Sequence, residues 1–60
     1  MVTKENFLNY EKARLSGEYN MFMDAAQVMN DYNIPADAYK DILQHYSDYY
    51  RKWIGSYYTN

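Results

Sequence analysis

Hydrophobic and polar positions separate almost completely along residues 35–54 when each residue is advanced by about 100° on a helical wheel. The apolar side chains fall within one arc of roughly 140°, which holds Tyr39, Ile42, Leu43, Tyr46, Tyr49, Tyr50, Trp53 and Ile54. Pro35 suits the first turn of a helix, where its missing N–H does no harm, and Gly55 suits the C-terminal cap. His45 falls on the polar side, which indicates a solvated side chain. This pattern predicts one amphipathic helix over residues 35–54.

The first half of the chain carries two shorter apolar patterns. Thr3 can cap a helix that begins at Lys4 and continues to about residue 16. A second apolar face repeats through residues 20–32, and the stretch "DYNIP" ends it, because the residue before a proline resists helical backbone angles. We therefore predict an all-α fold, a small bundle of three helices over residues 4–16, 20–32 and 35–54.

The stretch "RLSGEYNMFM", residues 14–23, can be interpreted in two ways. A spacing of seven links Leu8, Leu15, Phe22 and Met29. This spacing fits one long helix over residues 4–31, which would form a two-helix hairpin with the last helix. Against continuity, Gly17 can take the left-handed conformation that ends a helix, and Asn20 can cap a new helix. A helix of about 28 residues would also be roughly 42 Å long, more than the last helix can cover. We favour the break, and the hairpin is the alternative.

Sixty residues make one small domain, 1–60. A chain of this length buries only about 60% of the surface that its unfolded form exposes, so it needs further stabilisation. Without cysteine it has no disulfide or thiolate metal site, and with one histidine it lacks the nitrogen ligands of a classical zinc site. We therefore expect no metal and no cofactor, and we expect self-association to supply the missing stability.

The charge pattern argues against nucleic acid as a partner. The formal net charge is −2, and the six lysine and arginine residues are scattered along the chain. The stretch "MVTKENFLNYEK" has no apolar run, so we expect no signal peptide, and the apolar stretches are too short for a membrane span. The lack of cysteine is typical of a reducing cytoplasm.

The segment "RLSGEYNMF" resembles a motif, R-x-S/T-G-x-x-N-M-F, of small uncharacterised proteins from phages and prophages of Gram-positive bacteria. The matching positions are Arg14, Ser16, Gly17, Asn20, Met21 and Phe22. Some of those proteins also have a segment similar to "DILQHYSDYY", residues 41–50, so the resemblance covers about half the chain. They often have aspartate after the phenylalanine, where this chain has Met23, with Asp24 one place later. The resemblance carries no known activity, but it implies a phage accessory protein in the cytoplasm of an infected bacterial host.

Arg14 is a charged residue that falls within the apolar arc of the first predicted helix. An arginine beside the free N–H groups at the start of a helix forms a simple anion site. The candidate ligand-binding residues are Arg14, Ser16, Gly17 and Asn20. In the alternative interpretation, Arg14 is structural and pairs with Glu11 or Glu18 by helical spacing.

The sequence contains no recognisable catalytic arrangement, such as a nucleophile with a base or a phosphate-binding glycine loop. It is rich in residues typical of protein interfaces, with nine tyrosines, four methionines and one tryptophan. Together with the phage resemblance, this composition favours a non-enzymatic binding protein that oligomerises and inhibits or sequesters a host factor, for example as an anti-CRISPR in counter-defence. The alternative function is a sponge that sequesters an anionic signal nucleotide between subunits.

The expected oligomer is a homodimer. The last helix presents an aromatic face wider than two short helices can cover, so part of it should lie between two copies. Met23 falls on the polar side of the second helix, where an exposed apolar side chain has no role in a monomer. The expected interface residues are Tyr39, Tyr46, Tyr49, Tyr50, Trp53 and Met23.

Overall fold

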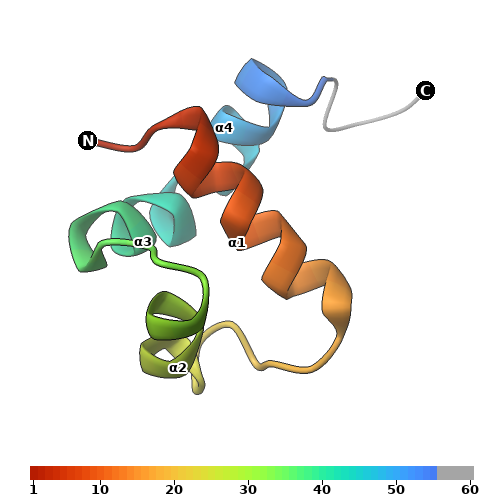
Figure 1. The fold of residues 1–60 in the computed structure, drawn as a ribbon. Helices are drawn as coiled ribbons and strands as arrows, with labels where there is room; N and C mark the ends of the chain where they lie inside the picture. Colours follow the sequence, from red (N-terminus) through yellow and green to blue (C-terminus); the bar gives the residue numbers. More distant parts are fainter. Residues whose placement is uncertain (56–60) are drawn as a thin grey trace.

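The computed structural model of the chain describes residues 1–55, which form four α-helices and no β-strand. Their bounds are α1 Lys4–Ser16, α2 Ala25–Asp31, α3 Ala36–Gln44 and α4 Tyr46–Trp53. α1 is the longest helix, and the other three are arranged around it (Figure 1). The all-α prediction is confirmed for these residues, but the prediction of three helices is wrong.

α1 begins and ends where the sequence predicts. Thr3 Oγ1 accepts a hydrogen bond from the Asn6 N–H (3.0 Å), and Asn6 Oδ1 accepts one from the Thr3 N–H (3.2 Å), so both donors are satisfied. At the other end, Gly17 adopts φ 73° and ψ 6° and donates its N–H to the Arg14 carbonyl (3.4 Å). Glycine adopts this left-handed conformation at little cost, and it ends the helix. The alternative of one long helix over residues 4–31 is therefore wrong.

The second helix begins at Ala25, later than the predicted residue 20. Asn20 Oδ1 accepts hydrogen bonds from the N–H groups of Phe22 (3.0 Å) and Met23 (2.9 Å). Asp24 closes the same turn, because its N–H donates to the Asn20 carbonyl (2.8 Å) and its carboxylate accepts the Asn20 N–H (2.8 Å). Local side-chain bonds of this kind compete with helix formation. Asn20 therefore caps a turn before α2, and helix 20–32 shortens to residues 25–31.

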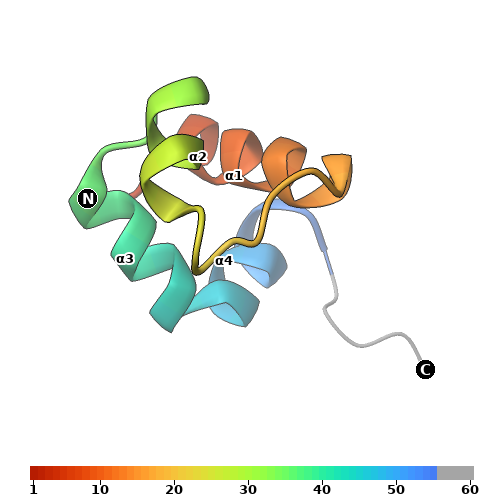
Figure 2. The same ribbon diagram turned by 90° about the horizontal axis from the view of Figure 1, so that it is seen from below.

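The predicted helix over residues 35–54 is divided at His45, whose backbone (φ −131°, ψ 36°) lies outside both α3 and α4. The His45 N–H still donates to the Asp41 carbonyl (2.9 Å), and the Tyr49 N–H donates to the His45 carbonyl (3.2 Å). The bend turns α4 back toward α1 (Figure 2). There the ring of Tyr46 lies 5.6 Å from that of Phe7, measured between centroids. Burial of aromatic rings against α1 therefore outweighs the continuity of one straight helix.

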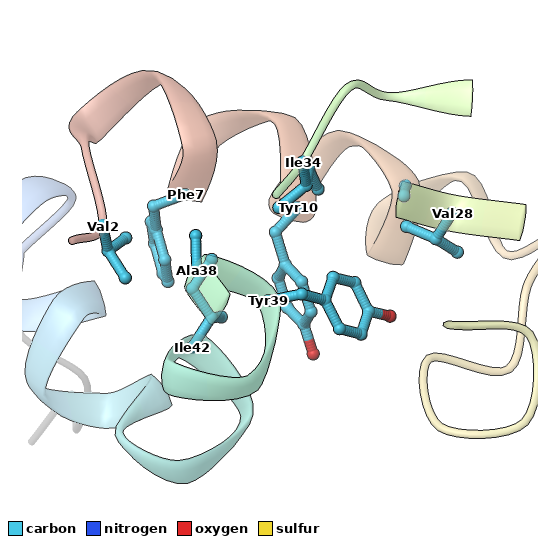
Figure 3. Close-up of a cluster of buried hydrophobic side chains, with 9 residues drawn as sticks. Val2, Phe7, Tyr10, Val28, Ile34, Ala38, Tyr39 and Ile42 are labelled. Atoms are coloured by element: carbon cyan, nitrogen blue, oxygen red, sulfur yellow. The ribbon is translucent and has the colours of Figure 1, made fainter. Parts of the chain in front are cut away.

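The hydrophobic core lies between α1, α2 and α3 (Figure 3). Its buried residues are Val2, Phe7, Tyr10, Ala13, Val28, Ile34, Ala38, Tyr39 and Ile42. α4 contributes no buried residue, but its partly buried rings pack against this core and cover Phe7. None of the helices in residues 1–55 has the length and apolarity needed to cross a bilayer.

Candidate functional site

Arg14 is bound to its own helix. Its Nε and Nη2 donate to the two carboxylate oxygens of Glu11, at 3.0 and 2.9 Å. This hydrogen bond is the main cause that raises the pKa of Arg14. Glu11 is buried, and its Oε2 also accepts a hydrogen bond from the Tyr46 hydroxyl (2.8 Å). The structural interpretation of Arg14, pairing with Glu11, is the one that the geometry shows.

The other candidate ligand-binding residues bond to their own backbone. Ser16 Oγ donates to the Ala13 carbonyl (2.7 Å) and accepts the Glu18 N–H (3.2 Å). Gly17 supplies the left-handed turn. The N–H groups that an anion would contact, those of Phe22 and Met23, already donate to the side-chain oxygen of Asn20. The Asn20 N–H donates to the carboxylate of Asp24 at 2.8 Å. The structure therefore brings these residues together as the framework of a turn, with a carboxylate where an anion would bind.

The aromatic residues predicted for a dimer interface mostly face their own chain. Tyr39 is 2% exposed, and its hydroxyl donates to the Met21 carbonyl (2.5 Å). The rings of Tyr49 and Trp53 lie 6.2 and 5.8 Å from Phe7, and these residues and Tyr46 and Tyr50 are partly buried. The face that seemed too wide for a monomer is covered by α1, because the bend at His45 brings α4 against it.

The large apolar side chains that remain exposed include those of residues 22 and 23. Phe22 is 75% exposed and Met23 is 85% exposed, while Leu15, at the end of α1, is 71% exposed. Met23 was expected on the surface. The pattern did not predict the exposure of Leu15 or of Phe22. For Phe22 the reason is that a helix beginning at residue 20 would turn its side chain inward. The asparagine and aspartate four residues apart, Asn20 and Asp24, are the sequence signal that could have revealed a turn.

Residues 17–24, which we call the presenting loop, are held at several points although they form no helix. Besides the bonds of Asn20 and Asp24, the Tyr19 hydroxyl donates to Asp31 Oδ2 (3.0 Å), and its ring meets that of Tyr32 edge-on at 5.9 Å. Met21 packs against the core. Gly17, Asn20 and Met21 thus belong to the presenting loop, and Phe22 is exposed on it. Arg14 and Ser16 precede the loop, in the last turn of α1.

The charged residues in the part of the sequence that contains the presenting loop have one sign. Residues 15–39 contain four acidic side chains and no lysine or arginine; the four are Glu18, Asp24, Asp31 and Asp37. The six basic residues all lie before or after this segment. The exposed apolar side chains of the loop therefore stand in an acidic stretch of the chain.

Within residues 1–55 we find no pocket and no group of three or more acidic or histidine side chains that could hold a metal ion. Comparison of the chain with protein-family models, curated proteins and solved structures found no match.

Proposed function

We propose that this chain is a phage-encoded, non-enzymatic binding protein that occupies a host protein through the presenting loop. Inhibition of a host defence, as by an anti-CRISPR, is one form that this function takes. The observation that carries the proposal is the exposure of Phe22 and Met23 on a loop that hydrogen bonds hold in place. The resemblance of residues 14–22 to the phage motif supports the origin.

The energetics of the loop suit binding. Burying a phenylalanine or methionine side chain is worth about 1.5–3 kcal/mol relative to leaving it exposed. A loop that is already ordered loses less conformational entropy when it docks, so more of that gain appears as affinity. Aromatic residues and methionine are also enriched at interfaces. Phe22 and Met23 therefore have the chemistry of anchor residues for a protein partner.

The charges indicate what kind of surface the loop fits. An apolar pair within an acidic segment is complementary to an apolar pocket with lysine or arginine at its rim. Such charges steer encounter, and they do so less at high salt. We therefore propose a host partner with a basic-rimmed apolar pocket, and an association rate that falls as salt is added.

The test is capture of a partner in a Gram-positive host, followed by loss of capture in a loop variant. The tagged chain is compared with the double variant Phe22→Ser and Met23→Ser. The matched control is Ile54→Ser, which removes an apolar side chain that is 45% exposed on α4's C-terminal end. We expect one host protein to bind the parent and the control, and to be lost from the double variant. A partner that binds the double variant equally well, or no specific partner at all, would contradict the proposal.

A further inference from the structure

α4 is attached to the rest of the domain by side chains and by one non-helical residue. His45 alone separates it from α3, and α4 contains no buried residue. Its main contacts with α1 are the hydrogen bond from Tyr46 to Glu11 and the ring contacts that Tyr46, Tyr49 and Trp53 make with Phe7. α4 is therefore an element that can leave its place without breaking the other three helices.

The same segment carries the pattern of a straight helix. Its apolar residues keep one helical phase from Tyr39 to Trp53, through the residue where the backbone bends. Straightening at His45 would join α3 and α4 into one continuous helix. The bent form thus gains the burial of aromatic rings against α1, whereas the straight form gains a continuous helix.

A straight α3–α4 helix would carry its aromatic face away from its own α1. It would leave Phe7 and the buried carboxylate of Glu11 uncovered. The element known to fit that surface is α4, since its Tyr46 bonds Glu11 and its rings pack on Phe7. A second copy of this chain supplies another α4 with the same side chains. A short hinge is also the common feature of domains that exchange an element between copies.

We propose that the chain forms a dimer by exchanging α4 across a straightened His45 hinge. Tyr46 of each copy then bonds Glu11 of the other, and each Phe7 is covered by the rings of the second copy's α4. This inference needs no host protein and goes beyond the binding function proposed above. It also differs from pairing through the presenting loop, because a symmetric contact there would set Glu18 and Asp24 of two copies against each other.

The first test changes the helix propensity of the hinge. Alanine favours a continuous helix and glycine opposes it. The equilibrium constant for a straight hinge should therefore be about five-fold larger in His45→Ala than in His45→Gly. A dimer contains two such hinges. Both variants remove an imidazole that lies 3.9 Å from Asp41 and from Asp48, so the loss of those contacts cancels in the comparison. Light scattering after refolding at high protein concentration should give dimer dissociation constants about 30-fold tighter for alanine than for glycine. Equal dissociation constants for the two variants, or monomers in both, would overturn the proposal.

The second test identifies the dimer contact. Isotope-labelled and unlabelled chains of His45→Ala are unfolded, mixed and refolded together, and isotope-filtered NMR then records contacts between copies. Exchange of α4 predicts signals between Phe7 of one copy and Trp53 of the other. If these two rings contact each other only within one chain, the dimer uses another surface and the proposal is wrong. Phe22→Ser is the control, since it should weaken host binding and leave the exchanged dimer intact.

Discussion

The hydroxyl of Tyr46 donates a hydrogen bond to Glu11 Oε2 at 2.8 Å, and so ties α4 to a carboxylate that is 5% exposed in α1. A buried carboxylate is tolerated only when its oxygens have hydrogen-bond donors. Arg14 supplies two of them and Tyr46 the third. This pair therefore fixes the position at which α4 docks, within a surface that is otherwise made of aromatic rings.

Tyr46→Phe removes this bond and leaves Glu11 with Arg14 alone. We expect the free energy of unfolding to fall by about 1.5–3 kcal/mol, the usual value of a hydrogen bond to a charged group. The control is Tyr49→Phe, which loses a bond to the more exposed carboxylate of Asp41 (2.8 Å) and should cost less. Urea denaturation followed by circular dichroism measures both. Equal losses would show that the Tyr46 bond has no special weight.

Alkaline pH should unfold the domain through its tyrosines. Burial is the largest cause that raises the pKa of Tyr10, Tyr39 and Tyr46, and that of Tyr39 rises to about 12. In the unfolded chain these hydroxyls ionise near pH 10, so the unfolded state releases protons that the folded state retains. The stabilising contribution of Tyr39 is complete below about pH 10 and is lost as the pH rises through about 12. Tyrosinate absorbance and helical circular dichroism should therefore change together in that range, whereas separate transitions would contradict the expectation.

The parts of the fold that depend on neighbouring residues could be predicted from the sequence. Thr3 and Gly17 make their capping hydrogen bonds to residues three positions away in the sequence, so both ends of α1 were predicted correctly. The turn at residues 20–24 was missed because Asn20 is equally able to cap a helix or to bond a turn, and Asp24 decides between them. In the candidate site, this error concealed the exposure of Phe22.

The bend at His45 could not be predicted from the pattern of its own segment, because the apolar arc continues through it without a change of phase. The cause lies in α1, where Phe7 and Glu11 offer a surface for Tyr46 and Trp53. The dimer interface predicted from the aromatic excess stays a prediction, while within one chain the rings of Tyr46, Tyr49 and Trp53 pack on Phe7. Contacts between residues far apart in sequence decide whether such a face meets its own chain or another.

Gly17→Ala should destabilise the domain through backbone conformation alone. An added Cβ would meet nothing within 4 Å, so no clash contributes, but the φ of 73° is unfavourable for alanine. We expect a loss of about 1 kcal/mol in thermal or urea unfolding. Asparagine tolerates the left-handed region better, so Gly17→Asn should lose less than alanine does. A larger loss for asparagine would indicate that space, and not φ, limits this position.

Asn20→Ala should loosen the presenting loop without changing its apolar side chains. The variant removes the acceptor of the Phe22 and Met23 N–H groups, and losing a capping side chain costs about 1 kcal/mol. Hydrogen exchange should show faster exchange of those two amides. Asn30→Ala, at an exposed position in α2, is the control and should leave them unchanged. If a host partner is captured, Asn20→Ala should lower its affinity for the chain although Phe22 is still present. The reason is that the loop of the variant must become ordered on binding.

The two phenylalanines of the chain separate stability from binding. Phe7 has no exposed surface and contacts the rings of Tyr46 and Trp53, whereas Phe22 is 75% exposed. Replacing a buried phenylalanine with alanine costs about 3–5 kcal/mol. The whole domain is expected to have only about 3–9 kcal/mol, at 0.05–0.15 kcal/mol per residue. Phe7→Ala should therefore leave the chain largely unfolded, while Phe7→Leu keeps a folded but weaker domain.

Phe22→Ala should leave the free energy of unfolding within about 0.5 kcal/mol of the parent, as is usual for an exposed position without special contacts. Calorimetry or urea denaturation of the Phe7 and Phe22 alanine variants, measured side by side, checks both expectations. A marked loss of stability in Phe22→Ala would mean that the ring packs on its own chain, and the presenting loop would then lose its anchor. Unchanged stability with loss of host binding would place Phe22 at the contact itself, because the fold that displays it would be intact.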